Sequence, residues 1–287
     1  MGSGIVIRFN HCGAEMATAN NREKSMKFSR HLMMAAAALA ISATAAKADL
    51  TFATDAAPYP PFTSQNAAGE WEGWEYDLLM ALCAEMNEKC TLIAVAWDGI
   101  IPALLEKKMD GIFGSMSITE ERKKQINFSD MYYNSASVII GPKGGDHNIA
   151  PEAFKGKSIG VQGSTTHANY TEKYFVPAGA EMKTYKGQDE ANADLAAGRV
   201  DYVQADGVTL NAFLTSDEGK ACCELYGAVP VDVEVLGPGV GVGLRKEDTA
   251  LLEKINAAIK SAAQKGIFEE LTKKYGLEGA LTLPPKQ

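Results

Sequence analysis

Segments with the composition of β-strands alternate with segments of helical periodicity along this chain. Residues 50–54 are strand-like, residues 73–86 have helical spacing, and residues 90–96 are strand-like again. A second series begins near residue 157. Further helical segments are expected at 99–106, 164–174, 190–197, 249–263 and 268–275, and further strand-like ones at 112, 138–140, 158–161 and 200–203. This alternation favours parallel-type α/β layers, and two such units of about a hundred residues indicate two lobes with a cleft between them.

The N-terminal region has the pattern of a secretory signal peptide. Residues 32–41 form an unbroken apolar run that follows Lys27 and Arg30 and precedes an Ala-Lys-Ala site at 46–48. This run is too short for a membrane-spanning helix, and no later segment is long and apolar enough to be one. We therefore predict a signal peptide at 26–48 and read residues 1–25 as a leader or a mis-called start. The product is expected to be soluble and exported.

The remaining 239 residues are acidic and suffice for one large or two ordinary domains. Residues 49–287 carry 22 Lys and Arg against 34 Asp and Glu, a formal balance of −12. Nucleic acids and anionic lipids are bound by basic surfaces, which this balance does not provide. We therefore expect no nucleic-acid partner, whereas a cationic ligand fits.

Export changes how the cysteines are interpreted. Cys83 and Cys90 flank the junction of a predicted helix and a predicted strand, and in an oxidising compartment a disulfide between them is favoured. A metal site would need further ligands nearby, and the sequence offers none. Cys222 and Cys223 are adjacent. They could form a vicinal bridge, pair with another chain or stay reduced.

Residues 110–122 read as a short buried strand that breaks into small hydroxyl residues and then starts a helix carrying Arg122. Free backbone N–H groups at a helix start, hydroxyl donors and a guanidinium together suit a carboxylate. Taken locally, Ser117 or Thr119 could simply cap the helix while Arg122 faces solvent. The rest of the chain favours the carboxylate site.

An ordered series of motifs resembles the periplasmic solute-binding proteins of the polar amino-acid family (family 3), near the lysine/arginine/ornithine and histidine binders. Each motif is weak alone, but the series keeps the family's order and covers essentially all of residues 49–287. The matching segments are 53–55, 59–62, 73–78, 97–104, 114–122, 160–166, 197–201 with Asp206, and 241–248.

The resemblance implies an α/β two-lobe fold of the type II, venus-flytrap kind, with each lobe a sheet flanked by helices and a two-strand hinge. Lobe 1 would comprise residues 49–137 and 240–287, and lobe 2 residues 138–239. The family closes on one amino acid and delivers it to an inner-membrane ABC permease. A periplasmic monomer with no cofactor and no metal is therefore expected.

The resemblance also assigns residue roles at the α-carbon of the ligand. Arg122 would hold the α-carboxylate, helped by Ser117 and by the backbone N–H of Thr166, and Asp206 would take the α-ammonium with Ser115 close by. These roles agree with elementary electrostatics, because a zwitterion taken out of water needs an opposite charge at each end. An arginine on one lobe and an aspartate on the other would tie closure to ligand.

At the ligand's side chain, Asp55 would meet a basic group between the aromatic walls Tyr59 and Trp97, since aromatic faces attract cations. An ordinary core or loop position for both rings is the alternative. The full ligand-binding set predicted is Asp55, Tyr59, Trp97, Gly114, Ser115, Ser117, Arg122, Ser164, Thr165, Thr166, His167 and Asp206.

Three departures from the family pattern affect specificity. The loop 55–59 is one residue longer than in the typical basic amino-acid binder. Gly114 stands where a serine is common, which predicts a larger floor of the site. His167 stands where glutamine is usual. The expected ligand is arginine, ornithine or lysine, then histidine, with an opine such as octopine or nopaline as the alternative.

An alternative of another class is an exported enzyme like cyclohexadienyl dehydratase, which shares this fold. Catalysis would need an acid or base against the leaving group. The histidines of residues 49–287 are His147 and His167, and Glu75 reads as a charge in the first turn of a helix. No catalytic residue is therefore predicted, and a binding protein is favoured over an enzyme.

Overall fold

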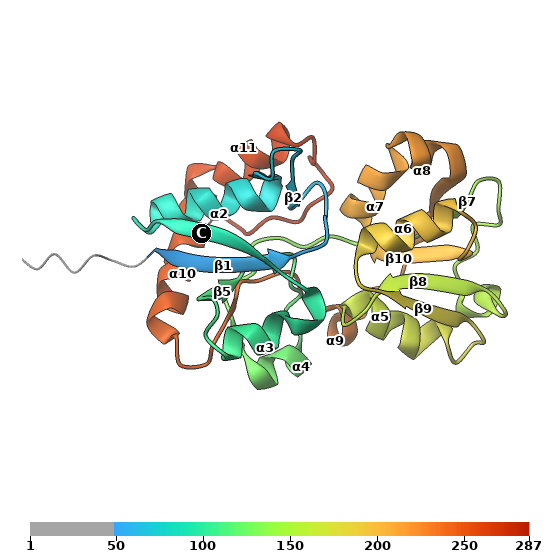
Figure 1. The fold of residues 1–287 in the computed structure, drawn as a ribbon, viewed down its shortest axis with the longest axis horizontal. Helices are drawn as coiled ribbons and strands as arrows, with labels where there is room; N and C mark the ends of the chain where they lie inside the picture. The colour runs from blue at the N-terminus through green and yellow to red at the C-terminus, as the bar shows by residue number, and fades with distance from the viewer. Residues whose placement is uncertain (1–48, 287) are drawn as a thin grey trace, which may run out of the picture. The chain divides into compact units, whose positions relative to one another are not determined.

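Two five-stranded sheets with helices packed against them organise the described part of the chain (Figure 1). This computed structural model describes residues 49–286. The predicted leader, 1–25, and the predicted signal peptide, 26–48, lie outside these residues. Among residues 49–286, no helix has the length and apolar character needed to cross a bilayer.

The first sheet has the strand order β4-β1-β5-β12-β6. Its centre, β1 (Leu50–Asp55), pairs in parallel with β4 (Cys90–Val95) and with β5 (Gly111–Ile112). By contrast, β12 (Gly243–Leu244) runs antiparallel to β5 and to β6 (Asn127–Phe128). A separate hairpin, β2 (Ser64–Gln65) with β3 (Trp71–Glu72), follows β1 in the chain. The predicted parallel arrangement thus applies to only part of the sheet.

Both faces of the first sheet are covered, because successive residues of β1 point to opposite sides. Phe52 belongs to one apolar cluster and Ala53 to another. The helices on the Phe52 side are α2 (Trp74–Glu85), α10 (Thr249–Lys265) and α11 (Ile267–Lys274). The helices toward the other side are η1 (Trp97–Gly99), α3 (Ile100–Leu105) and α4 (Glu120–Gln125).

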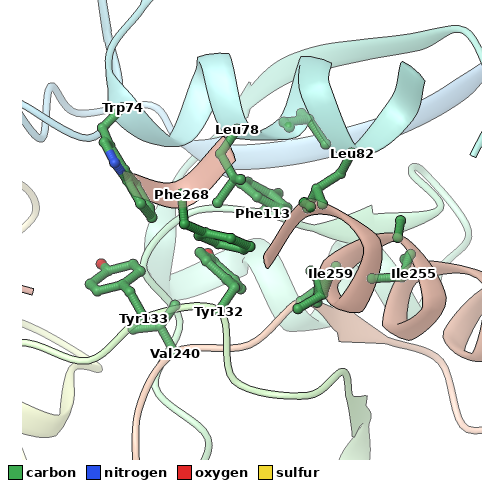
Figure 2. Close-up of a cluster of buried hydrophobic side chains, with 14 of the residues drawn as sticks. Trp74, Leu78, Leu82, Phe113, Tyr132, Tyr133, Val240, Ile255, Ile259 and Phe268 are labelled. Atoms are coloured by element: carbon green, nitrogen blue, oxygen red, sulfur yellow. The ribbon is translucent and has the colours of Figure 1, made fainter. Parts of the chain in front are cut away.

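The apolar face of α2 forms the centre of the larger cluster (Figure 2). Trp74, Leu78 and Leu82 recur every four residues and therefore lie on one side of the helix, where all three are buried. They pack with residues of α10 and α11 and with Tyr132 and Tyr133. These two tyrosines place their hydroxyls behind the site described below.

The second sheet has the order β11-β7-β10-β8-β9. In it, β8 (Ser158–Gln162) is parallel to β9 (Glu181–Tyr185) and β10 (Tyr202–Asp206), whereas β7 (Ser137–Pro142) is antiparallel to β10 and β11 (Cys223–Ala228). The strand β7 has to be antiparallel, because the chain enters it from the first sheet beside the end of β10. The prediction of parallel layers was therefore wrong for β7, whereas β8, β9, β10 and β11 run in one direction.

Helices also pack on both sides of the second sheet (Figure 1). On one side lie α6 (Gln188–Ala196), α7 (Gly207–Leu214) and α8 (Asp217–Cys222). On the other lie η2 (Pro151–Phe154), α5 (Thr166–Tyr170), the π-helix η3 (Thr171–Phe175) and α9 (Val233–Leu236). The helix predicted at 164–174 therefore starts two residues later and changes to π geometry after Tyr170.

Two segments carry the chain between the sheets, one before β7 and one before β12. They meet at an antiparallel bridge between Tyr133 and Val240. The strands of the two sheets fall within the predicted lobes, except that β7 begins at Ser137. The limits 49–137 with 240–287 and 138–239 stay a prediction.

Two disulfides are present among the described residues. Cys83 in α2 is bonded to Cys90 in β4, as the sequence predicted. Cys222 and Cys223, for which the sequence left three alternatives, form a vicinal bond where α8 meets β11.

Replacement of Cys83 or Cys90 by alanine should destabilise the protein by about 2–3 kcal/mol, since the bond closes a short loop that is otherwise free in the unfolded chain. Either single replacement breaks the same bond. The double variant Cys83→Ala/Cys90→Ala should therefore lose about as much free energy of unfolding as each single variant, as measured by urea unfolding. Strictly additive losses would contradict a bond between the two residues.

Candidate functional site

A pocket lies where strands of both sheets end. β1 and β8 end in Asp55 and Gln162, and β10 ends in Asp206. Every predicted ligand-binding residue except Ser164 lines this pocket. The lining residues are Thr54, Asp55, Tyr59, Thr63, Trp97, Gly114, Ser115, Ser117, Arg122, Gln162, Thr165, Thr166, His167 and Asp206. Sequence reasoning missed Thr54, Thr63 and Gln162.

Arg122 reaches the pocket from the first turn of α4, whose N-cap Thr119 accepts a hydrogen bond from the Arg122 backbone N–H at 3.2 Å. Its guanidinium donates to two carbonyl oxygens, that of Ser117 at 2.9 Å and that of Ser164 at 3.2 Å. Among residues 49–286, no carboxylate forms an ion pair with it. Desolvation lowers the pKa of Arg122 to about 10, so the group stays charged at neutral pH.

Asp206 presents its carboxylate from the end of β10. Oδ2 accepts from the Tyr59 hydroxyl and Oδ1 from the Ser135 hydroxyl, each at 2.7 Å. The side chain does not cap α7, although Asp206 occupies the N-cap position. Burial raises the pKa of Asp206, but its interactions with His167 and with the two hydroxyls outweigh burial and lower the pKa overall. The carboxylate is therefore ionised at neutral pH.

Asp55 is the second carboxylate of the pocket, and it is 8% exposed. Gln162 Nε2 donates to its Oδ2 at 2.5 Å, and the backbone N–H of Ala57 donates to its Oδ1 at 3.2 Å. Burial raises the pKa of Asp55, while these neutral donors oppose the rise. No Lys or Arg of the described chain pairs with it. The sequence signal for Gln162 was its place at the end of β8, which matches that of Asp55 at the end of β1.

Ser164, Thr165 and Thr166 form the turn into α5. Ser164 contributes its backbone, because its carbonyl accepts from the Trp97 indole N–H at 3.1 Å as well as from Arg122. Thr165 is the N-cap and accepts from Ala168 N–H at 3.1 Å. The Thr166 hydroxyl lies 3.4 Å from that of Ser117. These contacts join elements of the two sheets at the pocket.

A buried hydrogen-bond network supports the pocket from behind. Glu75 is fully buried in the first turn of α2 and accepts from the Ser115 N–H at 2.8 Å, the Ser115 hydroxyl at 2.9 Å and the Tyr132 hydroxyl at 2.6 Å. The Tyr133 hydroxyl donates to Ser115 Oγ at 2.8 Å. Burial raises the pKa of Glu75 to about 7. The sequence interpretation of Glu75 as a first-turn charge missed this network.

The network also fixes how Ser115 faces the pocket. Its backbone has a φ of 53°, a conformation that non-glycine residues rarely adopt and that is often found at functional sites. Because its hydroxyl proton goes to Glu75, Ser115 Oγ can offer the pocket only an acceptor. An acceptor beside Asp206 suits a bound ammonium.

Gly114 does not enlarge the floor of the pocket, contrary to the sequence prediction. A Cβ atom at this position would lie 2.5 Å from Thr54 Oγ1 and 3.0 Å from Thr54 Cα. Thr54 is held there by a 3.2 Å hydrogen bond between its hydroxyl and that of Thr63. The space of a serine side chain is thus already filled by a neighbouring strand residue.

The two aromatic wall residues make specific contacts with the protein itself. Tyr59 stacks on Phe62, with ring centroids 6.1 Å apart, while its hydroxyl binds Asp206. The Arg122 guanidinium carbon lies 5.5 Å from the centre of the Trp97 ring. Both rings line the pocket, and their stacking on a ligand side chain stays a proposal.

Comparison with known proteins gives a consistent result. The family model of bacterial extracellular solute-binding proteins, family 3, matches residues 50–278. The L-arginine-binding protein of Pseudomonas aeruginosa is 39% identical over 76% of this chain and 85% of its own. The histidine-binding periplasmic protein of Escherichia coli is 36% identical over 88% and 96%. An ancestral arginine-binding protein bound to arginine has a TM-score of 0.73 and 32% identity, covering 79% of this chain and 97% of that one.

The raised pKa of Glu75 predicts how stability depends on pH. Between about pH 4.5 and 7 the folded state holds a proton that the unfolded chain has lost, so the free energy of unfolding falls as pH rises. Relative to Glu75→Gln, the wild type should lose on the order of 2–3 kcal/mol across this window. The free energy of unfolding is measured by urea unfolding at a series of pH values. The same dependence on pH in the wild type and in Glu75→Gln would contradict the prediction. The exposed Glu278→Gln is the matched control.

Proposed function

Because the chain belongs to the bacterial extracellular solute-binding proteins of family 3, we propose that its pocket binds one basic L-amino acid. Arginine is the first candidate, followed by ornithine and lysine, then histidine. The protein serves an ABC importer from the periplasm, as an exported monomer that passes its ligand to an inner-membrane permease. It needs no nucleic acid and catalyses no reaction.

The charge balance of the pocket carries this proposal. The lining contains one guanidinium, Arg122, and two carboxylates, Asp55 and Asp206. Removing a charge from water without an opposite partner costs several kcal/mol. A basic amino acid supplies the three missing partners: its α-carboxylate for Arg122, its α-ammonium for Asp206 and its side-chain cation for Asp55. The charges of Arg122, Asp55, Asp206 and the ligand then cancel.

Other ligand classes fit this balance less well. A neutral amino acid leaves the carboxylate of Asp55 facing no cation. An opine carries at least one further carboxylate, and the lining offers no second arginine or lysine to receive it. The filled space at Gly114 also removes the reason to expect a larger ligand.

Contacts across the pocket support closure around the ligand. Asp55 with Gln162, Tyr59 with Asp206, and Arg122 with the Ser164 carbonyl each join a residue of the first sheet's side to one of the second's. These bonds engage the same three charged groups that the ligand would engage. A ligand that satisfies them from between the sheets therefore favours the closed state.

Asp55→Asn tests the assignment of the side-chain cation. The wild type should bind L-arginine at least about a hundredfold more tightly than L-citrulline, a neutral ligand of the same length, because citrulline leaves a buried charge unpaired. Asp55→Asn should lose most of this preference, with the loss falling on arginine. Isothermal titration calorimetry measures the affinity of the wild type and of Asp55→Asn for L-arginine and for L-citrulline.

The exposed Asp98→Asn serves as the matched control, since it removes the same charge beside the pocket and should keep the preference for arginine. Equal losses for both ligands in Asp55→Asn would contradict a contact between Asp55 and the side chain. Absence of arginine binding by the wild type would overturn the proposed function. Turnover of prephenate or arogenate by the purified protein would overturn the assignment as a non-enzyme.

A further inference from the structure

A chain of buried hydrogen bonds runs through the second sheet's side of the molecule and ends at His167. The Thr171 hydroxyl donates to Gln204 Oε1 at 2.7 Å, and Gln204 Nε2 donates to Ser137 Oγ at 3.0 Å. Ser137 Oγ lies 2.9 Å from His167 Nδ1. The other ring nitrogen, Nε2, lies 3.7 Å from Asp206 Oδ2. The proposed function assigns no role to this series of hydrogen bonds.

The sheet brings these groups together by register. Ser137 in β7 is paired with Asp206 in β10, and Gln204 lies two residues before Asp206 on the same strand. Gln204 is fully buried, and His167 is 8% exposed. Solvent is thus largely excluded from these hydrogen-bonded side chains, and their polar atoms depend on one another for hydrogen-bond partners.

The direction of the bonds favours one tautomer of the histidine. Ser137 Oγ accepts a hydrogen bond from Gln204 Nε2, so its own hydroxyl proton is free to donate to His167 Nδ1. Nδ1 is then an acceptor, and a neutral ring carries its proton on Nε2. That proton faces the carboxylate of Asp206, the group assigned above to the ligand's ammonium.

We propose that His167 is a proton-sensitive positioning residue for Asp206, resting on the proposed function of the pocket. Neutral His167 points Nε2–H at Oδ2 and leaves the carboxylate its full negative charge for the ligand's α-ammonium. Protonated His167 forms an ion pair with Asp206 and competes with that ammonium. Affinity for a basic amino acid therefore falls when His167 takes up a proton at lower pH.

The other charged and titratable groups near His167 do not provide the same switch. From the first sheet's side the pocket adds Asp55, Arg122 and Tyr59. The elements packed against α5 contribute further titratable or charged groups. Tyr202 lies in β10, and Glu172, Lys173 and Tyr174 lie in η3. Glu234 lies in α9, with Asp232 at the N-cap of that helix. Asp232 is bound by Lys173 and Tyr174. Burial raises the pKa of Asp55 and raises that of Glu75 to about 7, so these two groups can also take up a proton as the pH falls.

The tautomer can be measured without ligand. Long-range nitrogen NMR of the full chain should show neutral His167 with its proton on Nε2. Ser137→Ala removes the hydroxyl that donates to Nδ1 and should shift the population toward the Nδ1–H form. A wild-type ring protonated on Nδ1, or no effect of Ser137→Ala, would overturn the inference even if arginine binds as proposed.

The binding test compares arginine affinity at about pH 5 and about pH 7 by calorimetry. The ligand itself keeps its carboxylate, ammonium and guanidinium charged in this range. The wild type should lose about tenfold or more in affinity at the lower pH, the change expected when a group's pKa differs by one unit between free and bound protein. His167→Gln keeps an amide donor for Asp206 but cannot take up a proton, and its affinity should be nearly independent of pH.

Glu75→Gln tests whether Glu75, and not His167, causes the pH dependence. The proposal expects the pH dependence to persist in Glu75→Gln and to disappear in His167→Gln. The opposite pattern, or an unchanged dependence in His167→Gln, would contradict it. Thermal unfolding checks whether each variant is folded at both pH values. Lack of binding at the higher pH would refute the pocket's proposed function instead, and the NMR result would still decide the tautomer.

Discussion

The pocket depends on charges that the protein buries without pairing. Within residues 49–286, the Arg122 guanidinium donates to backbone carbonyls and Asp55 accepts from neutral donors, and neither is paired with an opposite charge. Stable folds avoid such groups, because desolvation is costly when no opposite charge is present. Their presence at facing strand and helix ends is best explained by a ligand that supplies the missing charges. The fold around the pocket can be understood as the support for this arrangement.

That support comes from two sources. The sheets bring Asp55, Gln162 and Asp206 to strand ends that meet at the pocket. Behind them, Glu75 accepts hydrogen bonds from Ser115, and the apolar cluster around α2 positions Tyr132 and Tyr133, which complete this buried hydrogen-bond network (Figure 2). Binding energy is therefore not spent on ordering these side chains, which favours tight and selective binding.

Much of the fold could be predicted from the sequence, because long periodic segments such as α2 and α10 have strong patterns and the motif order identified the family. The reversed strands β7 and β12 could not, because their direction depends on where the chain crosses between the sheets. In the site, charged residues stood out. The burial of Glu75 and the filled space at Gly114 depend on contacts between distant segments, which no local pattern reveals.

The most direct test of the charge-matching account is a crystal structure with bound L-arginine. The account predicts that the α-carboxylate accepts hydrogen bonds from the Arg122 guanidinium. The α-ammonium should donate to Asp206, and the ligand's guanidinium should donate to Asp55. An arginine bound with its side chain away from Asp55, or with its carboxylate away from Arg122, would contradict the account.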